Sequence, residues 1–168
     1  MNKGCKQTGL YFNYSIKSAF NRGDFCNLDS QNNSSMKIDP KEVSLGKLHN
    51  TLLGSVGPRP IAFASTIDKD GNRNLSPFSF FNVFSANPPI AIFSPAKSGR
   101  TNTQKDTYNN VKEVAECVIN IVNYPIVQQM SLSSTAYGPE VDEFEKAGLT
   151  AIPSEMVKPF RVKESPIQ

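Results

Sequence analysis

Short runs of apolar residues predict the strands of this chain. Residues 61–67 have strand composition, and a glycine-containing turn at 68–71 leads into a second apolar run at 74–84. These two runs are therefore expected to pair as antiparallel strands. A third predicted strand at 90–94 follows the proline pair at 88–89; it is nearly all apolar and is expected to be buried on both faces. Residues 116–122 form a fourth predicted strand, and residues 159–163 are a candidate for a fifth.

Short helices are predicted between these strands. One covers 108–114, with Asp106 or Thr107 as its N-cap, and a second covers 126–134. The third, at 142–148, begins with an acid followed three residues later by Glu145 and ends in glycine, which are cap signals at both ends. A loop is predicted over 40–60, because helix-breaking residues recur there: Gly54, Gly57, Pro58 and Pro60.

Composition changes near residue 36. Eleven of the first 35 residues are Asn or Ser, and all 12 prolines of the chain lie beyond them. Residues 1–35 are read either as a disordered extension or as an upstream start assigned ahead of the true one at Met36; we favour the second, because an ordered pattern begins at Met36. Residues 36–168 then form one domain. Its four or five short strands with helices between them predict a mainly β, α+β or barrel fold, and the lack of a G-x-G-x-x-G turn disfavours a doubly wound fold.

Charge and cysteine content exclude several classes of protein. The formal net charge is only +3 and most of it belongs to the first 35 residues, so a nucleic-acid or membrane partner is not expected. The three cysteines are far apart and there is a single histidine, so a zinc site is not expected either. No apolar run is long enough to span a membrane, and the basic start lacks the apolar segment of a secretory signal. The cytoplasm is the expected location.

Two stretches could bind a cofactor. Residues 74–85 interleave Ser and Asn with four phenylalanines, which suits a planar heteroaromatic ligand, although a core strand filled with aromatic residues has the same composition. Residues 100–109 place two cations and several hydroxyls at a predicted helix start, which favours a phosphate. A capped helix on a solvated face also explains the second stretch, and Asp106 would oppose an anion.

Three single residues are further candidates for a functional role. Arg59, held between two prolines, could face a ligand anion or form an edge salt bridge. His49 could donate a proton, but a lone histidine in a polar stretch is more often a surface residue. Cys117 lies in an apolar strand and is expected to be a core residue. No catalytic triad, acid pair or metal cluster emerges, so hydrolytic chemistry has little support.

The same stretches resemble the flavin reductase-like, FMN-binding split-barrel family, which includes flavoredoxin and NAD(P)H:flavin oxidoreductases. The order and spacing of the matching segments carry the resemblance: residues 57–66 (GPRPIAFAST), 74–82 (NLSPFSFFN), 87–89 (NPP), 105–107 (KDT) with Asn109, and 144–149 (FEKAGL). The likeness runs from about Met36 to Gln168.

The resemblance implies an antiparallel split barrel with inserted short helices that binds FMN at a homodimer interface, with NADH or NADPH as reductant. It implies that the first strand lies by the flavin and that a loop at residues 79–82 offers groups to the isoalloxazine and ribityl. It also implies that the stretch at 100–109 holds the phosphate. The cofactor-binding residues expected from it are Phe63, Ser65, Thr66, Ser79, Phe80, Phe81, Asn82, Arg100, Lys105 and Thr107. Relatives often carry Trp at the position of Phe63, and this chain has no Trp.

The resemblance leaves three functions open. In the family, further strands follow the stretch similar to residues 163–166, whereas this sequence stops at Gln168, so a C-terminally truncated domain is expected. The first function is an NAD(P)H-dependent flavin reductase, in which the cofactor carries the redox chemistry and no catalytic side chain is assigned. The second is an FMN-binding electron carrier without its own NAD(P)H turnover, and the third is a non-functional fragment.

Overall fold

The computed structural model describes residues 38–98, 102–138 and 140–168. The chain divides into two units, residues 1–57 and residues 58–168. Each unit is described by itself. The predicted N-terminal extension lies outside the described residues.

The first unit contains helix α1, Leu45–Ser55, where the sequence predicted a loop. The helix begins because the Ser44 side chain accepts a hydrogen bond from the backbone N–H of Lys47 at 3.3 Å, as an N-cap does. Two hydroxyls bond back to the preceding turn, Thr51 to the carbonyl of Lys47 and Ser55 to that of Thr51. Gly54 lies inside the last turn of the helix, which continues to Ser55 with Val56 as C-cap, so this glycine does not prevent the helix.

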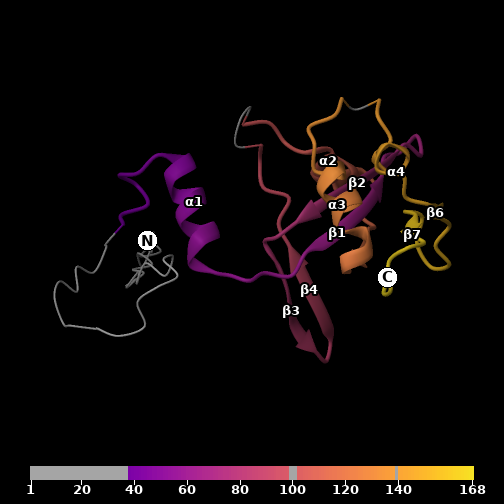
Figure 1. The fold of residues 1–168 in the computed structure, drawn as a ribbon, viewed down its shortest axis with the longest axis horizontal. Coiled ribbons are helices and arrows are strands. Elements are labelled where there is room, and N and C mark those ends of the chain that lie inside the picture. Colours follow the sequence, from indigo (N-terminus) through magenta and orange to yellow (C-terminus); the bar gives the residue numbers. More distant parts are fainter. Residues whose placement is uncertain (1–37, 99–101, 139) are drawn as a thin grey trace, which may run out of the picture. The chain divides into compact units, whose positions relative to one another are not determined.

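The second unit is built on a three-stranded antiparallel sheet, with β1 (Ala62–Ile67) between β2 (Arg73–Phe78) and β5 (Val118–Ile121). Figure 1 labels β1 and β2 of this sheet. The predicted turn joins β1 to β2, and its geometry comes from Asp68. Asp68 Oδ1 accepts hydrogen bonds from the backbone N–H groups of Asp70 at 2.9 Å and Asn72 at 2.8 Å, and Gly71 takes φ +88°. The predicted pairing of the first two strands is therefore confirmed.

Each face of this sheet is covered by different elements. Helix α3 (Val127–Ser133), which follows the 3₁₀ turn η1 (Tyr124–Ile126), and helix α4 (Glu143–Ala147) cover one face, which we call the core face. Phe63 and Leu75 pack there with Phe144 and Val162. Helix α2 (Asp106–Glu113) packs on β1 and β2 from the other side, which we call the α2 face. Successive residues of β1 alternate between the two faces.

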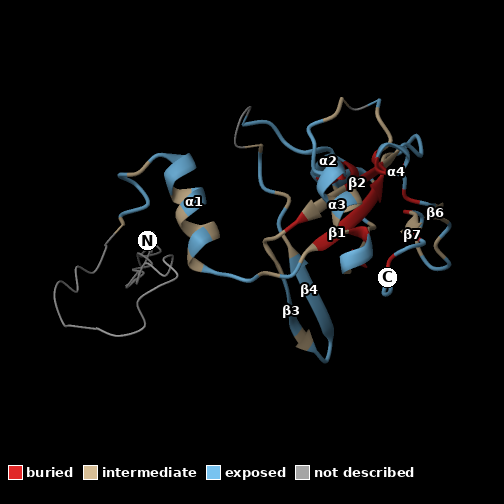
Figure 2. Cartoon of the chain, viewed as in Figure 1, coloured by how far each residue is buried: buried red, intermediate tan, exposed pale blue. Residues whose placement is uncertain are grey.

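Strands β3 (Phe81–Ala86) and β4 (Pro89–Phe93) form a separate hairpin. The predicted second strand, 74–84, is thus two strands interrupted at Ser79 and Phe80. The prediction that residues 90–94 are buried on both faces is wrong: within the described residues β4 pairs with β3 alone, and it is exposed along most of its length (Figure 2). An apolar run predicts a strand, but burial depends on what other segment covers it.

The remaining predicted elements are confirmed with shifted ends. Helix α2 begins at Asp106 with Lys105 as N-cap, because the carbonyl of Lys105 already accepts from the N–H groups of Tyr108 and Asn109. Helix α4 has both expected caps: Asp142 accepts from the N–H of Phe144 at 2.9 Å, and Gly148 is left-handed at φ +67°. A short pair, β6 (Ala151–Ile152) and β7 (Arg161–Val162), follows it; β6 was not predicted.

Candidate functional site

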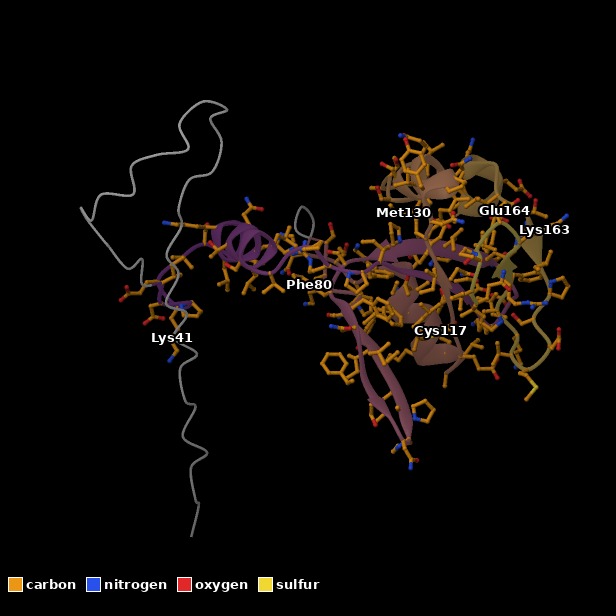
Figure 3. The ribbon with its side chains drawn as sticks, turned by 60° about the horizontal axis from the view of Figure 1, so that its bottom comes forward. Lys41, Phe80, Cys117, Met130, Lys163 and Glu164 are labelled. Atoms are coloured by element: carbon orange, nitrogen blue, oxygen red, sulfur yellow. The ribbon has the colours of Figure 1, made fainter. Side chains whose placement is uncertain are left out.

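The junction between β2 and β3 holds four of the predicted cofactor-binding residues: Ser79, Phe80, Phe81 and Asn82. The chain bends at Ser79 and Phe80, where the carbonyl of Phe80 accepts from the N–H of Ser94 at 3.0 Å. Figure 3 labels Phe80 where the hairpin joins the sheet. The bend places backbone groups, an aromatic ring and the exposed amide of Asn82 in one short segment.

Arg59 lies at this junction. Its guanidinium carbon is 6.0 Å from the centroid of the Phe80 ring, which is cation–π distance. Beside it, Phe81 packs against the buried cluster of Ala62, Ala64 and Phe78. The guanidinium therefore helps to orient the ring of Phe80, a role that the sequence left open between ligand contact and salt bridge.

Phe63 and Ser65 lie on the core face of β1, away from α2. Phe63 is fully buried in the hydrophobic core, and Ser65 Oγ is fully buried with no hydrogen-bond partner among the described residues. Neither side chain reaches the surface. Their assignment to the cofactor stays a prediction, and burial favours the simpler interpretation of Phe63 as a core residue.

Thr66 lies on the opposite, α2 face of β1 and belongs to a buried polar network. The amide nitrogen of Asn74 donates to Thr66 Oγ1 at 3.3 Å and to Thr107 Oγ1 at 2.9 Å. The amide nitrogen of Asn110 donates to Thr66 Oγ1 at 3.2 Å. All four side chains are buried. We call Thr66, Asn74, Thr107 and Asn110 the Asn–Thr network; it ties helix α2 to the sheet.

The first turn of α2 carries the predicted phosphate residues. Lys105 is exposed, and its Nζ lies 5.0 Å from the centroid of the Phe78 ring, so the charge is held at the edge of the aromatic cluster. No described side chain caps the helix at Lys105. Thr107, by contrast, is buried and its hydroxyl already accepts from Asn74. Arg100, the other predicted phosphate ligand, lies outside the described residues.

Sequence reasoning missed Asn74 and Asn110 as parts of this arrangement. The signal for Asn110 was its spacing, because residues three apart on a helix share a face, and Thr107 is three residues before it. Asn74 belongs to the aromatic motif, but nothing in the sequence indicates that its side chain faces α2.

Titratable groups around the sheet carry two relevant shifts. Partial burial raises the pKa of the Cys117 thiol. Cys117 is half-buried, lies just before β5 and belongs to neither buried cluster, so the predicted core position is not observed. Burial also raises the pKa of Glu143, which accepts the N–H of Leu75 on β2 at 3.1 Å; the negative charges of Asp106 and Asp142 add to this effect. Glu143 thereby holds helix α4 against strand β2.

Neither a membrane-spanning helix nor a metal-binding cluster occurs in the described part of the chain. None of its helices is long and apolar enough to cross a membrane. No group of three or more His, Cys, Asp or Glu side chains within the same residues could hold a metal ion.

Comparison with known proteins identifies the family. The family model of the flavin reductase like domain matches residues 54–168. An uncharacterized protein of Aquifex aeolicus is 43% identical over 132 residues, which cover 79% of this chain and 67% of that protein.

Two solved structures share the fold. Nitrilotriacetate monooxygenase component B from Bacillus cereus is 34% identical with a TM-score of 0.73, covering 80% of this chain and 65% of its own. A split barrel domain protein from Shewanella frigidimarina is 27% identical with a TM-score of 0.59, covering 74% of this chain and 60% of its own. This chain thus spans about two thirds or less of the proteins it matches. The antiparallel sheets and short helices described above are those of a split barrel, and the chain belongs to the flavin reductase-like family.

Proposed function

We propose that this chain binds FMN and acts as an NAD(P)H-dependent flavin reductase. The observation that carries the proposal is the family match, which spans every candidate cofactor-binding residue from Phe63 to Thr107. When bound, FMN would supply the redox chemistry by accepting a hydride from the nicotinamide, and the protein would bind and orient the two cofactors.

The start of α2 fits the phosphate of FMN. A helix N-terminus carries partial positive charge, and here no described side chain caps it at Lys105, whose own ammonium lies beside it. Asp106 in the same turn opposes an anion, so the lysine charge is needed to balance it. We assign Lys105 and Arg100 to the phosphate. Thr107 would contribute by fixing the helix, because its hydroxyl is buried and bonded to Asn74.

The junction after β2 fits the flavin ring system. Ser79 and Asn82 offer polar groups to the ring edge and ribityl chain, and Phe80 and Phe81 offer apolar surface. Lys105 connects the two ends of this proposed site, since its ammonium contacts Phe78, the residue immediately before the junction. For Phe63, Ser65 and Thr66 we propose a supporting role through the position of strand β1.

We also propose a homodimer in which the β3–β4 hairpin contacts a second copy of the chain. Four large apolar residues of this hairpin are exposed, namely Val83, Phe84, Ile90 and Ile92. Ile90 and Ile92 lie on one face of β4, since alternate residues of a strand share a face. A two-stranded hairpin is marginally stable alone in water, and exposed apolar residues on it are candidates for an interface. The second copy as occupant follows from the dimer that the family resemblance implies.

The proposal is tested with the purified protein. We expect FMN to bind with a perturbed visible spectrum, and NADH or NADPH to be oxidised only when FMN is present. Stopped-flow reduction of the bound flavin by each nicotinamide separates the two flavoprotein functions. Bound FMN that neither nicotinamide reduces, but that a partner protein reduces, favours the electron carrier; protein that takes up no FMN contradicts both.

A further inference from the structure

The Asn–Thr network is built across two strands and one helix. Thr66 of β1 and Asn74 of β2 lie directly opposite each other in the antiparallel register, so both side chains face α2. Thr107 and Asn110 are three residues apart on α2 and face the sheet. The network therefore joins elements that are distant in sequence at one buried contact.

Asn74 is the centre of this network. Its amide nitrogen donates to one hydroxyl on the sheet and one on the helix, so both of its N–H groups are used. Thr66 Oγ1 in turn accepts from both asparagines. Buried polar groups of this kind bond in only one arrangement, because a shift of the helix would leave a donor or acceptor unpaired. Asn74 consequently sets where the first turn of α2 lies on the sheet.

A second contact fixes the same turn along the same strand. Asn74 and Phe78 share the α2 face of β2, since they are four residues apart and alternate positions share a face. Asn74 bonds Thr107, and Phe78 contacts the ammonium of Lys105. Asn74 thus fixes the backbone of α2 at Thr107. Phe78 fixes the charge of Lys105, which lies two residues before Thr107.

We infer that Asn74 is a positioning residue for the phosphate end of the flavin site, so that it sets the preference of the protein for FMN over riboflavin. The inference rests on the proposed function. Asn74 is nearly fully buried and is not expected to touch the ligand. Its effect passes through Thr107 to the N–H groups of the first helical turn and to Lys105. Removing Asn74 should therefore weaken binding of the phosphate and leave binding of the ring system unchanged.

The test compares dissociation constants for FMN and riboflavin by fluorescence, with each variant held well below its own Tm. In Asn74→Ala, the ratio of riboflavin to FMN dissociation constants is expected to fall about tenfold, the effect of roughly one hydrogen bond. Thr107→Val, which keeps the side-chain volume, should produce the same fall. Thr107→Ser retains the hydroxyl and should recover most of the ratio.

Asn120 supplies the matched control. It is a buried asparagine of the same sheet on the opposite, core face, where its amide bonds the carbonyl of Phe63 at 3.0 Å and the N–H of Val162 at 2.8 Å. Asn120→Ala should lower Tm without changing the FMN-to-riboflavin ratio. Hydrogen exchange without flavin gives an independent measurement: the α2 amides should exchange faster in Asn74→Ala and Thr107→Val, and not in Asn120→Ala.

The outcomes separate the inference from the function on which it rests. Wild-type protein that binds neither flavin overturns the proposed function and the inference with it. Wild-type protein that prefers FMN, combined with variants that weaken FMN and riboflavin equally or not at all, overturns the inference alone. If Asn74→Ala does not fold, the comparison of Thr107→Val with Thr107→Ser decides the question.

Discussion

At the scale of single residues, several side chains have roles that their chemical type alone does not indicate. Thr107 is typical of a phosphate-binding hydroxyl, but it is buried and accepts from Asn74. Arg59 is a candidate anion ligand, yet its guanidinium lies over the ring of Phe80. Lys105 remains exposed, at the start of a helix, and is the described cation best placed to meet an anion.

Lys105→Ala is expected to weaken FMN binding about tenfold or more, because it removes one charged contact with the phosphate. Riboflavin has no phosphate, so its binding should be nearly unchanged. The effect should shrink as salt is added, because screening weakens the interaction of an exposed charge with phosphate. Titration with both flavins at two ionic strengths checks this. Lys112→Ala, in the last turn of the same helix, is the control with the same change in net charge; equal effects of the two variants would contradict the assignment.

Glu143→Gln should stabilise the protein at neutral and alkaline pH. Burial is the main cause of the raised pKa of Glu143, so the folded state holds its proton more tightly than the unfolded state does. Stability is therefore lost as the pH rises through the raised pKa of Glu143 in the folded protein. A neutral glutamine avoids this loss, and its amide oxygen can still accept a hydrogen bond from the N–H of Leu75.

Thermal unfolding of wild type and Glu143→Gln across pH measures this effect. The variant should have the higher Tm at pH 8, and the difference should vanish below the usual glutamate pKa of about 4.3. Glu113→Gln, on the exposed side of α2, controls for the change in net charge. A Tm difference that grows as the pH falls would contradict the prediction.

At the scale of elements, helix ends follow local chemistry closely. The caps of α4 are an aspartate and a left-handed glycine, both read from the sequence. Helix α1 was missed because the glycines and prolines between residues 54 and 60 were taken to exclude a helix, whereas Ser44 caps one before them. Interruption of the second strand at Ser79 and Phe80 was also missed, because neither residue type by itself breaks a strand.

Gly54 and Gly148 both have room for a Cβ but differ in backbone conformation, so replacing each by alanine should have opposite effects. A Cβ added at Gly54 or at Gly148 would meet no atom within 4 Å, but only Gly148 has positive φ, at +67°. Gly54→Ala should therefore stabilise α1 by about 0.5–1 kcal/mol through backbone entropy. Gly148→Ala should destabilise the second unit by roughly 1–2 kcal/mol through left-handed strain.

Hydrogen exchange of the α1 amides measures the first change, and urea denaturation measures the second. The two substitutions should have opposite signs. Loss of stability in both variants would show that Gly54 has a close neighbour in solution.

At the scale of the whole molecule, the chain leaves part of its apolar surface uncovered. The core face of the sheet is closed by α3 and α4. In the β3–β4 hairpin only the base packs on the sheet, through Phe81 and Phe93, and most of the other described residues are exposed (Figure 2). The matched proteins are longer than this chain, so the activity and assembly of a full-length relative apply here only as proposals.

The double variant Ile90→Thr/Ile92→Thr tests the proposed dimer. Threonine keeps the β-branched shape that suits a strand but removes apolar contact, so dimerisation should weaken roughly a hundredfold or more. Sedimentation at several concentrations measures the equilibrium. Leu132→Thr, an exposed apolar residue on α3, is the control and should have no effect. A wild-type chain that remains monomeric at high concentration would contradict the proposal.

The sequence by itself determined those features that depend on a few neighbouring residues: strands β1 and β5, the Asp68 turn, the capped helix α4, and the motifs that indicate the family. Local hydrogen bonds and alternation specify these wherever the segment lies. Only the tertiary structure decided which side of a strand or helix is covered. Phe63 and Thr66 are three residues apart in one predicted site, but they face opposite sides of the sheet. Burial depends on α2, α3 and α4, which arrive from distant parts of the chain, and so the burial of Thr107 and the exposure of β4 could not be read from either segment alone.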